Sequence, residues 1–231
     1  MDVDDFSPGR IFDLPRELPA PASEKEKALV LKLDQFTRTF IHRSAAGGGI
    51  SPEDRALLLE LADLACESAM AGTVLGFISL ITGEFPAMRE LYRSMIALHG
   101  ELPPLLFYAA IADEKTGDLE AALIKLEKLM GSGLKNYWVY LSAARLFHRL
   151  GRFQQGLDAA NLAVMENREH SMEPFAVLAQ CYHSLGQLDR MVECFRRVEE
   201  VVGREGLENT FGPLYQAHRQ LYGNIRSHIL S

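Results

Sequence analysis

Residues 140–153 read YLSAARLFHRLGRF, and this stretch decides the fold of the 231-residue chain. An apolar helical pattern leads up to Gly151, and a second apolar pattern begins two residues later at Phe153. This order predicts a helix, a tight turn at the glycine and a second, antiparallel helix. Such a hairpin cannot bury its apolar face alone, so it needs similar hairpins beside it.

The same glycine recurs along the chain at intervals of 34, 34 and 35 residues, as Gly83, Gly117, Gly151 and Gly186. Each has a small residue seven positions before it and, except in one repeat, a large apolar residue nine positions after it. The small residues are Gly76, Ala110, Ala144 and Ala179, and the later positions hold Tyr92, Leu126, Ala160 and Phe195. Small residues let two helices approach closely, and bulky residues fill the spaces of the next hairpin. Stacked hairpins of this kind share one continuous core and form a superhelix.

A 34-residue helix–turn–helix period with this order of small and large residues resembles the tetratricopeptide repeat (TPR). The best matches lie at 140–163 and 175–195. Three positions depart from the family pattern, because Asp113 and Gly72 stand where an aromatic residue is usual and Met88 stands where a small one is usual. The family's helix-ending proline is also missing after the second helices. The resemblance implies an all-α fold, a right-handed superhelical array of antiparallel helix pairs, with extra N- and C-terminal helices.

The expected organisation has four parts. About four repeats occupy 69–203, capping helices occupy 23–68, and a C-terminal capping helix occupies 204–231. Residues 1–22 contain four prolines and no helical period, so they form an extended or disordered tail. An alternative is that apolar residues of this tail dock onto the chain's own groove or onto a partner.

Charge and composition exclude several classes of function. The net charge is −7 and the pI about 5.5, with Lys and Arg spread among acids, which argues against a nucleic-acid partner. The 16-residue uncharged stretch between Glu67 and Glu84 is too short for a membrane-spanning helix, so no membrane insertion is expected. Cys66, Cys181 and Cys194 have no ligand spacing and suit a reducing compartment, and the acidic N-terminus is unlike a secretory signal. These features predict a cytoplasmic protein.

Catalytic and cofactor motifs are missing from the sequence. It contains no zinc-binding or phosphate-loop motif and no nucleophile beside a base, so we expect no enzymatic activity, no cofactor and no metal. His148 and His183 each lie three residues before a repeat glycine and therefore project from equivalent places on adjacent first helices. A metal site there is a minor alternative to two exposed groove histidines.

The resemblance implies that function resides in the concave groove, which the first helices of TPR hairpins mostly form. It assigns to this groove the positions thirteen, ten, six and three before each glycine. Ten of these residues are our candidate partner-binding site: Phe77, Leu80, Phe107, Ile111, Trp138, Leu141, Arg145, His148, Gln180 and His183. Trp and Arg are frequent energetic anchors, so Trp138 and Arg145 are the first candidates.

This projected groove is apolar in its first half and polar or basic in its second, which suits a peptide with hydrophobic side chains and one or more acids. The alternative is that Phe77, Leu80 and Phe107 are covered by the upstream helix or the tail. The predicted function is a protein–protein interaction scaffold or adaptor that binds a partner polypeptide segment. Narrower or weaker alternatives are a cytoplasmic chaperone of a bacterial type III secretion system, an enzyme or small-ligand binder on this scaffold, and a homo-oligomer.

Overall fold

A computed structural model describes residues 23–45, 51–52, 68–167 and 171–229. The predicted tail and nearly all of the helix expected at about 52–67 lie outside these ranges. The regular secondary structure of the described residues is helical throughout, as the repeat pattern predicts. None of the described helices is long and apolar enough to cross a bilayer. The chain divides into two compact units, residues 1–133 and 134–231.

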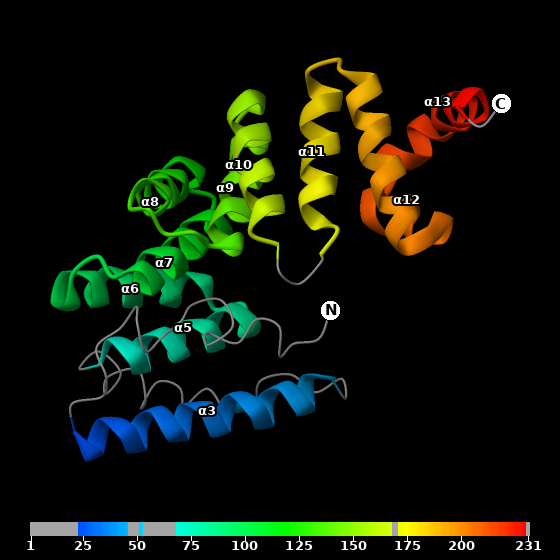
Figure 1. Cartoon of the computed structure of the whole chain (residues 1–231). Coiled ribbons are helices and arrows are strands. Elements are labelled where there is room, and N and C mark those ends of the chain that lie inside the picture. The colour runs from blue at the N-terminus through cyan, green and yellow to red at the C-terminus, as the bar shows by residue number, and fades with distance from the viewer. Residues whose placement is uncertain (1–22, 46–50, 53–67, 168–170, 230–231) are drawn as a thin grey trace. The chain divides into compact units, whose positions relative to one another are not determined.

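The first unit contains five helices within its described residues, and consecutive ones pack against each other. Their bounds are α3 (Glu24–Ala45), α5 (Ala69–Thr82), α6 (Phe85–His99), α7 (Pro103–Lys115) and α8 (Leu119–Gly131). Figure 1 shows α5 lying between α3 and α6. Ser23 begins α3, because its hydroxyl oxygen accepts a hydrogen bond from the Glu26 amide at 3.1 Å. Prolines in the first turns of α6 and α7 cost no internal hydrogen bond there.

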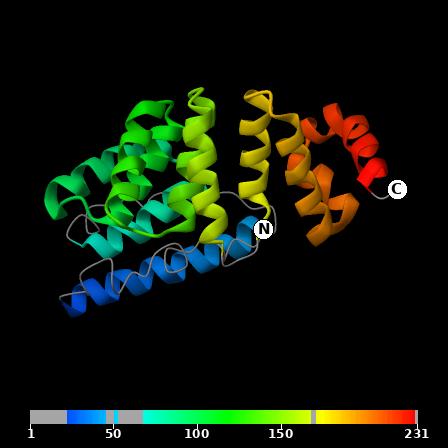
Figure 2. The same cartoon turned by 45° about the horizontal axis from the view of Figure 1, so that its top comes forward.

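The second unit continues the same arrangement. Its helices are α9 (Tyr137–Arg149), α10 (Phe153–Met165), α11 (Glu173–Ser184), α12 (Leu188–Phe211) and α13 (Pro213–Ile229). Figures 1 and 2 show α11 between α10 and α12, and α9 contacts both α10 and α11. Helix α12 is interrupted at Gly203 (φ 71°, ψ 177°), and α13 begins after a second turn at Gly212, where Pro213 opens the new helix.

All four repeat glycines adopt the left-handed backbone conformation that a tight turn after a helix requires. Their φ angles are 78°, 94°, 75° and 71° in chain order. In each turn the amide after the glycine donates to a carbonyl five residues earlier, as in Asp118 N to Asp113 O (2.8 Å) and Arg152 N to Phe147 O (2.8 Å). This is the hydrogen bond of a Schellman motif, which satisfies a carbonyl left open at the helix end. The prediction of helix turns at these glycines is confirmed.

The repeat positions supply the core of both units. The residues nine positions after the glycines are at most 1% exposed: Tyr92, Leu126, Ala160 and Phe195. The close approach predicted for the small positions is tightest at Gly76. A Cβ atom built there would lie 1.5 Å from Tyr92 Oη, and that hydroxyl donates to Gly72 O at 3.2 Å. The size of residue 76 therefore limits how close α5 and α6 can lie.

Among the described residues, Asp113 is the one charged residue that is buried, with a side chain 5% exposed. Its Oδ1 lies 2.8 Å from Arg89 Nε of α6, and its Oδ2 lies 2.5 Å from Lys125 Nζ of α8. Arg89 also pairs with Asp118, whose side chain caps α8 by accepting from the Ala121 amide. The carboxylate that replaces the usual aromatic residue thus links three consecutive helices through charge-assisted hydrogen bonds.

Two buried tyrosines stack between α6 and α7, and only one of their hydroxyl groups is hydrogen-bonded. The Tyr92 and Tyr108 rings are 5.8 Å apart and nearly parallel, but Tyr108 Oη has no hydrogen-bond partner among the described residues. We expect Tyr108→Phe to raise the free energy of unfolding by about 1 kcal/mol, because the variant no longer buries an unpaired hydroxyl.

The matched change Tyr92→Phe is expected to lower the free energy of unfolding by about 1 kcal/mol, because it removes the bond to Gly72 O. Urea unfolding of the two variants beside the wild type measures both effects. Equal destabilisation by both changes would contradict the assignment of the Tyr108 hydroxyl as unpaired.

Candidate partner-binding face

The candidate residues of the first unit lie mainly within the fold. Phe107 is 3% exposed and packs edge-on against Tyr108, with ring centroids 5.5 Å apart. Ile111 is half-buried on α7. Phe77 and Leu80 lie on α5, and their side chains are outside the described part of the structure. The described portion of the predicted apolar half therefore offers little surface to a partner.

Two candidates of the second unit are also buried. Leu141 is fully buried, and Trp138 is 8% exposed, with its ring against Tyr137 at a centroid distance of 5.0 Å. Both belong to the early turns of α9. A tryptophan that is buried to this extent contributes mainly to the packing of the second unit.

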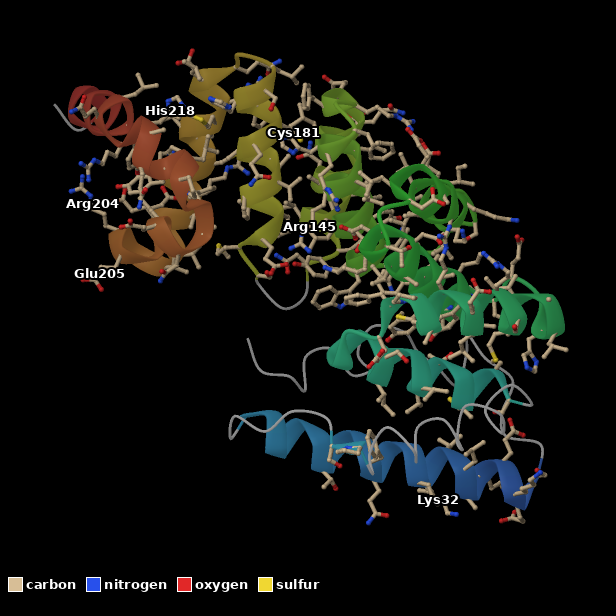
Figure 3. The ribbon with its side chains drawn as sticks, turned by 180° about the vertical axis from the view of Figure 1, so that it is seen from behind. Lys32, Arg145, Cys181, Arg204, Glu205 and His218 are labelled. Atoms are coloured by element: carbon tan, nitrogen blue, oxygen red, sulfur yellow. The ribbon has the colours of Figure 1, made fainter. Side chains whose placement is uncertain are left out.

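The remaining candidates come together on one face. Arg145, Gln180 and His183 are exposed, and His148 is half-buried. Arg145 Nη2 of α9 lies 2.9 Å from Glu173 Oε2 of α11, and Figure 3 shows Arg145 beside α11. One turn further along α9, His148 Nε2 lies 3.3 Å from Ser184 Oγ. We call the surface made by Arg145, His148, Glu173, Gln180 and His183 the α9–α11 face.

The face extends to α13 through a histidine that the glycine spacing did not identify. The rings of His183 and His218 are 4.9 Å apart between centroids and inclined at 63°. No repeat glycine follows His218, so offsets counted from the glycines do not reach it. Its distance of 35 residues from His183, equal to the distance from His148 to His183, is the signal that could have identified it. Its contact with His183 adds a third helix to the face.

Comparison with known proteins identifies the architecture. No model of a protein family matches the sequence, and no curated protein matches it. Solved structures do match. A TPR protein from Parabacteroides merdae is 16% identical, covering 81% of this chain and 73% of its own, with a TM-score of 0.61. The chain has the TPR fold.

Two further TPR-like matches are MamA and YrrB. MamA is 18% identical, covering 76% of this chain and 99% of its own, with a TM-score of 0.57. YrrB, described as a TPR protein with an unusual peptide-binding site, is 16% identical, covering 70% of this chain and 84% of its own, with a TM-score of 0.56.

Within the TPR fold of the second unit, the first helices of two hairpins, α9 and α11, contact each other directly. This contact brings the exposed candidate residues together.

Among the described residues, no group of three or more His, Cys, Asp or Glu side chains is arranged to hold a metal ion. The chemistry that the face offers is therefore hydrogen bonding and charge: a guanidinium, an amide, imidazoles and one carboxylate.

His148 makes stability depend on pH. Burial lowers the pKa of His148 below its usual value, and the nearby His183 lowers it further. A lowered pKa means that the unfolded chain binds this proton more readily than the folded protein. The stability that the neutral imidazole contributes is therefore fully present above about pH 6.5 and is lost as the pH falls below that value.

The free energy of unfolding of the wild type is expected to fall between about pH 7.5 and about pH 5.5, and His148→Gln is expected to make this fall smaller. The difference between the two proteins is less than about 1 kcal/mol, because the ring is only half-buried. Urea unfolding at several pH values measures this difference. His99→Gln, in the first unit, controls for the loss of an imidazole. Parallel pH profiles for the wild type and His148→Gln would contradict the expectation.

Proposed function

We propose that this protein is an interaction scaffold or adaptor and that a polypeptide segment of its partner docks on the α9–α11 face. The observation that carries the proposal is the convergence of exposed hydrogen-bonding side chains from two neighbouring first helices, Arg145 from α9 and Gln180 and His183 from α11. An extended peptide has an amide and a carbonyl at nearly every residue, and groups of this kind pair with them.

Of the ten residues predicted from the sequence, the proposed site includes Arg145, His148, Gln180 and His183. It also includes Glu173, which pairs with Arg145, and His218, which contacts His183. The peptide-binding site named for YrrB supports a polypeptide as the occupant, since the two chains share a fold. A catalytic role receives less support. The Ser184 hydroxyl lies 3.3 Å from His148 Nε2, but His148 makes no second hydrogen bond among the described residues that would orient it as a base. We place the protein in the cytoplasm on its cysteine pattern, and a type III secretion chaperone is a narrower form of the same proposal.

Site-specific photo-crosslinking tests the proposal directly. A photoreactive amino acid replaces Gln180, which is exposed on α11, and in a control protein it replaces Gln154, which is exposed on α10. Both proteins are irradiated in a lysate of the source organism, and the adducts are identified by mass spectrometry. We expect one polypeptide to crosslink through position 180 and not through position 154.

Adducts that form equally at both positions would place the binding surface elsewhere. The additional variant Arg145→Ala distinguishes specific binding at this face from chance contact with the photoreactive residue. It removes a proposed binding residue and leaves the photoreactive residue unchanged. An adduct at position 180 whose yield does not change in this variant would remove Arg145 from the site.

A further inference from the structure

Charge is unevenly distributed among the helices of the second unit. The helices that carry the α9–α11 face and its extension, α9, α11 and α13, contain four arginines and a single acid, Glu173. The other two helices, α10 and α12, contain seven acids and four arginines. The arginines are equal in number on the two sets, so the difference lies in the acids: the first set carries a net charge of +3, four arginines less one acid, and the second −3, four arginines less seven acids. The net charge of the whole chain does not show this difference between the two sets of helices.

Arg145 of α9 keeps binding capacity beyond its ion pair with Glu173. Its side chain is 47% exposed, and the ion pair with Glu173 uses one N–H of a guanidinium that has five. A carboxylate from a partner can therefore approach the same guanidinium from solvent. Arg149 is exposed one turn further along α9, where it adds a second positive charge beside the face.

The uncharged residues of the face also suit an anionic peptide. Gln180 is exposed and offers both a donor and an acceptor to a backbone. His183 and His218 supply further N–H donors from adjacent helices. No large apolar side chain named for this face is exposed, since Trp138 and Leu141 are buried, so hydrophobic anchors are a minor part of its chemistry.

We propose that the segment bound at the α9–α11 face is acidic, a stretch of polypeptide rich in Asp and Glu. This inference rests on the proposed function and specifies its partner by charge. The acidic α10 and α12 contribute to selection, because they repel the same segment and so favour one side of the unit.

A nucleic acid is the other polyanion to consider, and the face suits it less well. Single-stranded nucleic-acid sites combine a continuous basic groove with exposed aromatic rings for base stacking. Here the four aromatic residues of α9, Tyr137, Trp138, Tyr140 and Phe147, are each at most 8% exposed.

Fluorescence anisotropy with short labelled peptides tests the proposal on the full chain. The probes are an alternating Glu–Ser peptide, the matching Gln–Ser and Lys–Ser peptides, and an oligouridine of similar length. We expect the Glu–Ser peptide to bind at least about tenfold more tightly than the other three at about 20 mM salt and to weaken several-fold at about 200 mM.

Two charge reversals identify the surface. Arg145→Glu is expected to weaken Glu–Ser binding about tenfold or more, whereas Arg190→Glu, which makes the same change in net charge on the exposed side of α12, leaves it within about twofold. Circular dichroism and thermal unfolding first establish that both variants fold. Equal losses in the two variants would show a net-charge effect and overturn the proposal.

The peptide results also separate this inference from the proposed function. Binding of the Gln–Ser, Lys–Ser or oligouridine probe as tightly as Glu–Ser overturns the acidic preference, and so does the absence of Glu–Ser binding. If a polypeptide still crosslinks through position 180 in those cases, the face binds a partner of different chemistry. Without such an adduct, both proposals fail.

Discussion

Removing both cations around Asp113, in the double variant Arg89→Met/Lys125→Met, is expected to lower the free energy of unfolding by about 3–5 kcal/mol. The Asp113 side chain is 5% exposed and pairs with both cations in the folded protein. Without them, a carboxylate remains buried between three helices with no compensating charge, which carries a large desolvation cost.

Replacing the carboxylate as well is expected to restore much of this loss. In the triple variant Asp113→Leu/Arg89→Met/Lys125→Met, an apolar cluster of similar volume occupies the site of the ionic one, and such exchanges are often neutral or stabilising. Urea unfolding of the double and triple variants measures the recovery. Lys128→Met removes an exposed pair with Glu101 and should cost less than about 1 kcal/mol. A triple variant less stable than the double would contradict this account.

The second large effect is expected at Gly76. Gly76→Ala should lower the free energy of unfolding by about 2 kcal/mol or more, because the new methyl group would lie 1.5 Å from Tyr92 Oη and 2.2 Å from Tyr92 Cζ. Tyr92 is fully buried and hydrogen-bonded to Gly72 O, so its ring cannot move aside without loss. The gain in helix propensity, about 1 kcal/mol, offsets only part of the clash.

Gly131→Ala is the matched control for this change. Gly131 also lies in a helix, but a Cβ atom there would meet nothing within 4 Å, so alanine should be neutral or slightly stabilising. A compensating variant identifies the mechanism: Tyr92→Leu makes room, so Gly76→Ala should cost less in that background. An unchanged cost in the Tyr92→Leu background would show that the clash with the ring is not the cause.

The sequence predicted the fold in detail because its signals are periodic. Four glycines in register specify four left-handed turns, and the offsets from them locate small and large residues that the structure buries. A backbone turn and a close helix contact each restrict which residue can occupy a position, so both leave a mark in the sequence. Asp113 was visible as a departure from the family pattern, but its partners Arg89 and Lys125 become evident only when α6, α7 and α8 are packed.

The site was less predictable for a related reason. The offset of a residue from a glycine gives the direction in which its side chain leaves the helix. It does not tell whether a neighbouring helix covers that side chain. Leu141 and Arg145 lie four residues apart on α9 and point the same way, yet one is fully buried and the other exposed. His218 was not predicted because no repeat glycine follows it on α13, although its 35-residue distance from His183 repeats the distance from His148 to His183.

The ion cluster at Asp113 has a consequence for how this array can change by duplication or recombination of its repeats. Repeats in which every position follows one consensus are interchangeable, since each presents the same surface to the next. Here Arg89 of the first hairpin pairs with Asp113 and Asp118 of the second, whereas Lys125 shares a hairpin with Asp113. A copy inserted between the two hairpins, or a deletion of the first, would leave the buried Asp113 with one cation in place of two. Exchange at this junction therefore costs more stability than exchange between repeats that share no buried charge.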